Sequence, residues 1–108
     1  MIDARIVLTT AGSSQEAEKI AGALVERRLA ACVNIIPQIQ SVYRWEGKVE
    51  RAAEWLLLIK TRAEVFARLR DAIKELHSYE VPECIMLKIG EGAEAYLRWI
   101  AESTVSQP

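Results

Sequence analysis

The pattern of apolar and polar positions along the chain predicts four strands and three helices. Short β-branched or alternating runs are typical of strands, and apolar residues that recur every three or four positions are typical of helices. The order of the predicted elements is βαββαβα. Strands are predicted at about residues 5–10, 32–45, 48–60 and 84–89, and helices at about residues 14–29, 65–76 and 93–103.

Capping and breaking residues support these helix boundaries. Ser13 and Glu16 have the spacing of a capping box before the first helix, and Thr61 and Glu64 repeat that spacing before the second. The second helix is expected to stop near His77, because a proline follows and cannot continue a helix.

The second and third strands form an unusually long hairpin. Glu46-Gly47 supplies its turn, since glycine allows a positive φ. Pro37 lacks a backbone N–H, which predicts an edge strand with a bulge at that point. With right-handed crossovers, the element order gives an α+β, ferredoxin-like fold, in which two helices cover one face of an antiparallel sheet and an extra helix follows at the C-terminus.

The other face of this sheet needs a cover. Residues 55–59 and 84–87 are continuously apolar, which indicates burial on both sides of the sheet. The third helix, with Tyr96, Leu97 and Ile100 inward, is short. The hairpin would reach roughly 40 Å, beyond a compact domain of this length.

We therefore expect a symmetric homo-oligomer rather than a lone chain. Aromatic and apolar residues on a projecting hairpin are typical of interface cores. A monomer whose bent hairpin folds back on itself is the alternative. The residues expected at the interface are Tyr43, Trp45, Val49 and Trp55.

Composition narrows the choice of partner and compartment. The chain has 108 residues and a formal net charge of -1, which predicts one domain over residues 1–108 and favours neither nucleic acid nor a membrane surface as a partner. No apolar run approaches the length of a membrane helix, and the N-terminus lacks signal-peptide features, so we expect a cytoplasmic protein. Cys32 and Cys84 are isolated among apolar neighbours, which predicts buried, reduced thiols. Residues 106–108 are expected to form a loose tail.

The single histidine lies in the stretch ELHSYEVPE, residues 75–83. At a helix end, His77 would bond the last helix carbonyls. As a ligand, its imidazole suits copper or zinc, with Glu80 or Glu83 as further donors, but a tight site needs three or four ligands held together. An acid/base role lacks a recognisable partner. We therefore expect a helix end first, and a weak metal site at His77 second.

The loop after the first strand is a candidate anion site. Thr10, Gly12 and Ser13 combine a glycine, hydroxyls and the free N–H groups of a helix start, although Ser13 could simply cap the helix. The loop lacks the arginine that acylphosphatases of this strand order require. Residues 49–60 lack the basic and exposed aromatic pattern of RNA-recognition domains. No catalytic residue is assigned, and the chain is expected not to be an enzyme.

Four ordered stretches resemble the CutA family of divalent-cation tolerance proteins. They are ERRLAACV at residues 26–33, SVYRWEGKVE at 41–50, ELHSYEVPE, and YLRWI at 96–100. The resemblance covers essentially the whole chain. It implies a ferredoxin-like fold, a tight trimer whose sheets face the three-fold interior, and a cytoplasmic protein linked to copper and other divalent cations.

The chain departs from the family at the copper site proposed for some members. That site uses a cysteine of the first strand and two adjacent histidines, and the resemblance aligns these positions with Thr9, Leu76 and His77. Of these three positions, only position 77 retains a metal-ligating side chain. Ser78 stands where the family usually has a proline after the histidine. Two functions stay open: a non-enzymatic homotrimer linked to divalent-cation tolerance, or a trimeric sensor that binds a small anionic metabolite between subunits.

Overall fold

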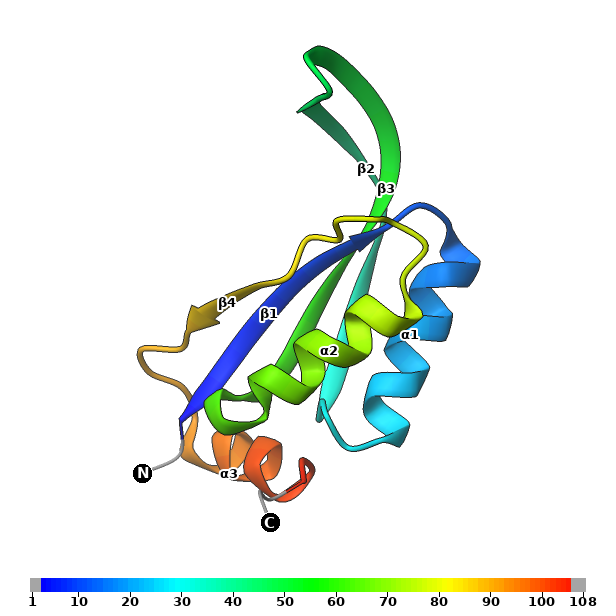
Figure 1. Ribbon diagram of the computed structural model, residues 1–108. Helices are drawn as coiled ribbons and strands as arrows, with labels where there is room; N and C mark the ends of the chain where they lie inside the picture. The colour runs from blue at the N-terminus through cyan, green and yellow to red at the C-terminus, as the bar shows by residue number, and fades with distance from the viewer. Residues whose placement is uncertain (1–2, 106–108) are drawn as a thin grey trace.

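The computed structural model of the protein describes residues 3–105, so the predicted tail at 106–108 lies outside the described residues. Four strands form one antiparallel sheet in the order β2-β3-β1-β4. Helices α1 and α2 lie on one side of it and α3 lies at its lower end (Figure 1). The predicted α+β, ferredoxin-like arrangement is confirmed. The elements are β1 (Ala4–Ala11), α1 (Ser14–Glu26), β2 (Cys32–Trp45), β3 (Lys48–Arg62), a short 3-10 turn (Ala63–Val65), α2 (Phe66–Leu76), β4 (Ile85–Lys88) and α3 (Glu94–Glu102).

The main core lies between the sheet and the two helices α1 and α2. Alternate residues of the central strands, such as Val7 of β1 and Leu57 of β3, point to the helices and are fully buried. They meet the apolar stripe of α1, for example Ile20, and that of α2, for example Leu69. Helices α1 and α2 therefore bury this face of the sheet within one chain.

The opposite face, called the open face below, is apolar and poorly covered. Strand register places Leu8 opposite both Leu58 and Ile85, and Ile6 opposite Leu87. Neither buried core cluster contains any of these residues. Ile85 and Leu87 are 49% and 46% exposed. The expectation that continuous apolar runs need cover on both sides agrees with this geometry. The apolar residues of the open face are Ile6, Leu8, Ile36, Leu56, Leu58, Ile85 and Leu87.

The hairpin of β2 and β3 projects from the body as an arm (Figure 1). A register shift between Ile36 and Ile39 gives the bulge predicted at Pro37, with Gln38 at φ 50°. At the tip, Glu46 and Gly47 both have positive φ, as a type I′ turn requires. The arm contributes to a longest dimension of 44 Å, against 26 and 22 Å across the molecule. The edge position of β2, its bulge and the hairpin turn are all confirmed.

Helix α3 covers only one end of the open face. Ile100 is buried against Ala4 and Ala31 in a small second core. Tyr96 is 44% exposed, so the prediction that it faces inward was wrong; it stacks on Trp99 instead. The reason is that α3 packs its narrow apolar stripe against the sheet end and leaves its flanks free.

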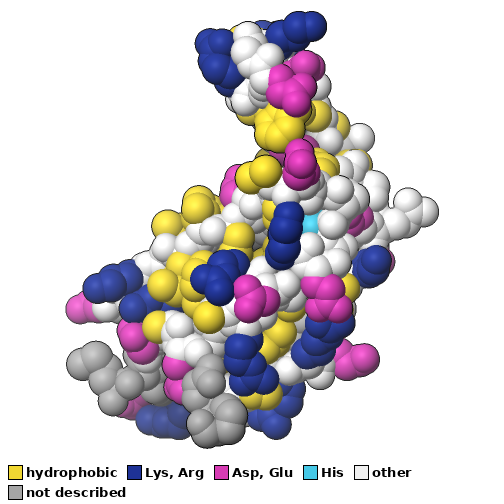
Figure 2. Space-filling model, viewed as in Figure 1, with side chains coloured by type: hydrophobic (Ala, Val, Ile, Leu, Met, Phe, Trp, Pro, Cys, Tyr) yellow, Lys and Arg dark blue, Asp and Glu magenta, His cyan; other side chains and the backbone are white. Residues whose placement is uncertain are grey.

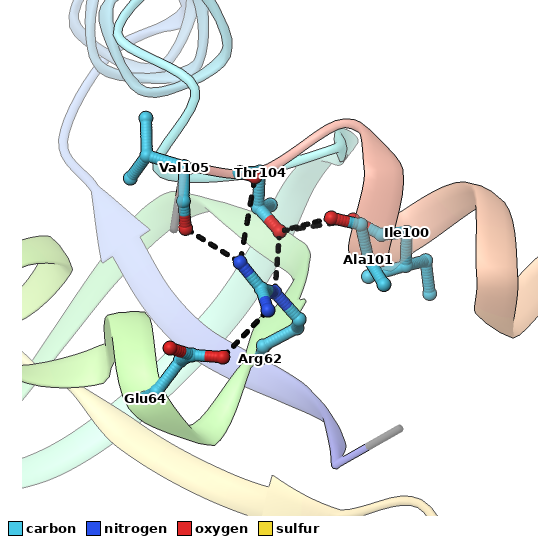
Figure 3. Close-up of polar contacts among 6 residues, drawn as sticks. All are labelled: Arg62, Glu64, Ile100, Ala101, Thr104 and Val105. Carbon is cyan, nitrogen blue, oxygen red and sulfur yellow. Dashed lines mark hydrogen bonds and ion pairs between the residues drawn. The ribbon is translucent and has the colours of Figure 1, made fainter. Parts of the chain in front are cut away.

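An arginine of β3 fixes the segment that follows α3. The Arg62 guanidinium donates to the Thr104 hydroxyl at 2.7 Å, to the Val105 carbonyl at 2.5 Å and to the Glu64 carboxylate at 2.6 Å (Figure 3). The Thr104 hydroxyl donates in turn to the carbonyl of Ile100. Charge-assisted bonds of this kind are stronger than neutral ones, so they hold α3 against the lower end of the sheet.

Two predicted boundaries differ from the structure. Helix α1 ends at Glu26, not at Leu29, because Arg28 adopts φ 59° and the Leu29 N–H bonds the Leu24 carbonyl, which is a Schellman end without a glycine. The capping box at Thr61 was also wrong. Thr61 is buried in β3 and donates to the carbonyl of Leu29.

The two cysteines are free thiols in the structure, and both are half-buried rather than fully buried. Cys84 packs against the main core, and Cys32 lies at the edge strand beside Asn34. Among residues 3–105, no helix is long and apolar enough to cross a membrane. Seen from the helix side, charged side chains lie over α1 and α2, while hydrophobic side chains show around β4 and at the base of the arm (Figure 2).

Candidate functional site

The predicted site residues meet where β1 ends, α1 begins and α2 ends. We call this meeting point the junction and define it by Thr10, Gly12, Glu16, His77 and Ser78. Next to it, the base of the arm forms a groove that Thr10 also lines. Residues 75–83, which were singled out in the sequence, contribute side chains to both the junction and the groove.

His77 ties α2 to β1 rather than closing its own helix. Its side chain is fully buried. The ring Nε2 lies 2.6 Å from the carbonyl oxygen of Thr10, and Nδ1 lies 3.1 Å from the backbone nitrogen of Tyr79. A carbonyl can only accept, so Nε2 carries the proton and Nδ1 accepts from Tyr79. The prediction that His77 caps α2 carbonyls was therefore wrong, although the helix does stop at this residue.

The positions of the family's copper site do not fit a copper ion in this chain. In the described conformation both nitrogens of His77 are used, which leaves no ring lone pair for a metal. Thr9 is buried on the core side of β1, with its hydroxyl unpaired among the described residues, and Leu76 is apolar. Within residues 3–105, no three His, Cys, Asp or Glu side chains are placed to hold a metal ion.

The predicted anion site is filled by the chain's own carboxylate. Ser13 accepts from the Glu16 N–H at 3.1 Å and so caps α1, as the alternative reading held. The Glu16 carboxylate turns back and accepts from the Gly12 N–H at 3.4 Å and from the Ser78 N–H at 2.8 Å. The carbonyl of Thr10 serves His77. The three residues Thr10, Gly12 and Ser13 thus lie together, but Glu16 occupies their anion-binding groups.

Glu16 therefore gives the junction a dependence on pH. Burial alone would raise the pKa of its carboxyl, but the hydrogen bonds from Ser78 and Gly12 outweigh burial and hold that pKa below its ordinary value. A depressed folded pKa stabilises the fold fully above the unfolded value near 4.5, and the contribution is lost as pH falls through the folded pKa.

Glu16→Gln is expected to flatten the acid limb of the stability curve. The free energy of unfolding, measured with urea between pH 3 and pH 6, should decrease less steeply as the pH is lowered in this variant than in the parent chain. Glu26→Gln, an exposed carboxylate at the end of α1, is the matched control and should keep the parent slope. An unchanged slope in Glu16→Gln would show that the junction carboxylate is not coupled to folding.

The groove at the base of the arm has a volume of about 680 Å³. At its floor the Tyr79 hydroxyl donates to the Glu54 carboxylate at 2.7 Å, and Glu54 is only 8% exposed. Gly12 makes room for this phenol, because a Cβ there would meet the Tyr79 hydroxyl at 3.1 Å. The residues that line the groove are Thr10, Ile39, Gln40, Ser41, Val42, Tyr43, Trp45, Glu54, Leu56, Tyr79, Glu80, Val81 and Glu83.

Among the residues described as lining the groove, three are glutamates and none is a lysine, arginine or histidine. Burial raises the pKa of the Glu83 carboxyl, and the nearby Glu54 charge raises it further. Burial also raises the pKa of the Tyr79 phenol, with the hydrogen bond to Glu54 adding to the effect. Tyr79 therefore stays a proton donor at neutral pH, and its hydroxyl orients the Glu54 side chain.

Three of the four predicted interface residues lie on the arm. Tyr43, Trp45 and Val49 are 44%, 43% and 54% exposed, as a projecting hairpin requires. Trp55 lies elsewhere: it pairs with Ala11 and packs against the main core. The reason is register, since odd-numbered residues in this half of β3 face the helices.

Sequence analysis missed the two carboxylates that organise the site. Glu16 was assigned only to a capping box, and Glu54 was given no role within the third strand. The available signal for Glu54 was its position beside the apolar run at residues 55–59, where a charge enters the sheet. No local signal connects it to Tyr79, which lies 25 residues further along the chain.

Comparison with known proteins agrees with the fold. The family model described as CutA1 divalent ion tolerance protein matches residues 5–103. The divalent-cation tolerance protein CutA of Thermus thermophilus is 50% identical over 99 residues, covering 92% of this chain and 96% of the relative. The human protein CutA is 45% identical over 97 residues, covering 90% of this chain but only 54% of its own length. The solved Thermus thermophilus structure covers 94% of this chain and 99% of its own, with 49% identity and a TM-score of 0.93.

Proposed function

Because the chain belongs to the CutA1 divalent ion tolerance protein family, we propose that it works as a non-enzymatic homotrimer linked to divalent-cation tolerance. The observation that carries the assembly is the open face. A sheet that exposes Ile36, Ile85 and Leu87 beside Leu8 and Leu58 gains by packing against another copy. The open face supports self-association, and the family resemblance supplies the number of subunits.

The arm supports the same proposal. Tyr43 and Trp45 stand on a hairpin that projects from the body (Figure 1), and they are 44% and 43% exposed in a single chain. Rigid aromatic side chains of this kind are typical of the energetic centre of an interface. In a symmetric assembly each arm would reach a neighbouring copy, and each copy would receive an arm.

The link to copper rests on the family resemblance and not on a metal site in this chain. The proposal therefore assigns tolerance to the assembled protein without placing an ion at Thr9, Leu76 and His77. A catalytic role for the imidazole is disfavoured as well, since Nε2 and Nδ1 are both engaged in buried hydrogen bonds. The proposal includes the cytoplasmic location expected from the sequence.

Copper binding is expected to be weak. In a calorimetric titration of the purified protein with copper, nickel and cobalt salts, any heat should follow the order copper above nickel above cobalt without a tight complex. The matched pair is the parent chain and His77→Gln, which should behave alike because the ring lone pairs are already used. Tight copper binding that His77→Gln abolishes would contradict the assignment of His77 to structure.

A second candidate function is small-molecule sensing, and the groove is the observation that favours it. The sequence suggested an anionic ligand at Thr10, Gly12 and Ser13, but Glu16 occupies the donors of that loop. The groove beside it is open to a ligand and lies against the predicted interface residues Tyr43 and Trp45. A ligand there would contact the very surface through which copies are proposed to associate.

A further inference from the structure

The groove at the base of the arm has one sign of charge. Three carboxylates line it, those of Glu54, Glu80 and Glu83, and its described lining includes no lysine, arginine or histidine. Glu54 is nine-tenths buried, and among the described residues its side chain accepts a hydrogen bond from the neutral hydroxyl of Tyr79. A buried carboxylate without a cation is costly, so the site gains free energy when a positive charge enters.

The rest of the lining suits an organic cation. Tyr43, Trp45 and Tyr79 bring three aromatic rings to the same groove, and Leu56 and Val81 add apolar surface. Ammonium groups are attracted to the faces of such rings, most strongly when water is excluded. The volume of about 680 Å³ lies within the range of small-molecule sites.

A bare metal ion fits this groove less well. A divalent ion needs several ligand atoms around one point, and no three acidic, cysteine or histidine side chains of residues 3–105 converge in that way. Glu54, Glu80 and Glu83 line the groove without converging on one point. Separate negative charges in a groove that also has apolar surface match an elongated ligand that carries its positive charges at separate points.

We propose that this groove binds a small aliphatic cation with two or more ammonium groups. Glu54 would hold one ammonium at the floor, Glu80 and Glu83 would hold another nearer the surface, and the rings would cover the methylene chain between them. The inference rests on the sensing function proposed above, and it replaces the anionic ligand expected from the sequence with a cationic one. In a trimer a neighbouring copy would cover the open side of the groove.

The test is a calorimetric titration of the purified full chain with spermidine at low salt, near pH 7.5. Spermidine should bind saturably. Glu54→Gln and Glu83→Gln should each weaken binding about tenfold, the loss expected for one charge-assisted hydrogen bond. Glutamine at position 54 still accepts from the Tyr79 hydroxyl, and Glu83 is exposed, so at least one variant keeps the parent fold. Glu91→Gln, an exposed carboxylate in the loop before α3, is the matched control and should bind as the parent does.

Light scattering on the same samples separates this inference from the proposed assembly. A trimer that gives no saturable heat with spermidine overturns the cation site and leaves the assembly standing. A monomer that binds spermidine, and loses it in Glu54→Gln, overturns the assembly and keeps the site. Equal weakening in Glu91→Gln would show general surface charge and overturn the site. Saturable binding of ATP in place of spermidine would also overturn it, in favour of an anion.

Discussion

Replacing Leu87 with glutamate is expected to break the proposed trimer into single chains. Leu87 lies on the open face opposite Ile6 and is 46% exposed in one chain. In a lone chain a carboxylate there would reach water at little cost. In the proposed trimer it would be buried without a partner, which costs about 3 kcal/mol or more for each subunit. Symmetry repeats that cost at every copy.

Met86→Glu is the matched control for this prediction. Met86 is the preceding residue of β4 and is 39% exposed, but it pairs with Val7 and lies on the helix side of the sheet. Met86→Glu introduces the same change in charge as Leu87→Glu, in the same strand. Light scattering should give the trimer mass for Met86→Glu and the single-chain mass for Leu87→Glu. The same mass for both variants would contradict the assignment of the open face to the interface.

Replacing His77 with alanine is expected to destabilise the protein by about 3 kcal/mol, because two hydrogen bonds are lost and the Thr10 carbonyl is left without its partner. The ring also packs on Tyr79, with centroids 4.5 Å apart. A histidine that only closed its own helix would contribute about 1 kcal/mol. Urea unfolding at fixed protein concentration distinguishes the two values.

A graded pair of variants makes the His77 prediction more specific. His77→Gln retains an N–H donor that can reach the Thr10 carbonyl, so it should recover part of the stability lost in His77→Ala. Both variants should keep the trimer mass, since His77 lies on the helix side of the sheet at the junction and not on the open face. If both variants lost only about 1 kcal/mol in the free energy of unfolding, His77 would act only as a helix end.

Most of the fold was predictable because its signals are local. The turn at Glu46-Gly47 and the bulge at Pro37 follow from which residues accept positive φ or lack an N–H. The continuous run at residues 55–59 indicated burial on both faces of β3. In the structure Leu57 and Ile59 face the helices, while Leu56 and Leu58 face the other way.

The errors in the fold have physical causes that sequence patterns do not carry. After α1, Arg28 adopts a left-handed conformation that glycine usually occupies at this position, so the sequence gives no sign of the helix end. Thr61 resembles a helix cap but is held in β3, because its hydroxyl bonds the carbonyl of Leu29. Trp55 stays a prediction for the interface, and within one chain strand register places it against the main core, where it is only partly buried.

The candidate site was predicted only in outline. The stretch at residues 75–83 was recognised as unusual, but its partners come from distant parts of the chain. His77 meets Thr10 across 67 residues, and Tyr79 meets Glu54 across 25 residues. Contacts of that separation depend on how the sheet and helices pack, so the acidic groove emerges only in three dimensions.

The mass of the unmodified protein in solution tests the central claim most directly. Light scattering at low micromolar concentration should give about three times the chain mass of 12.1 kDa, because the open face and the arm are proposed to be covered by other copies. A stable mass of 12.1 kDa under the same conditions would contradict that account, since a lone chain would then keep its apolar sheet face in water.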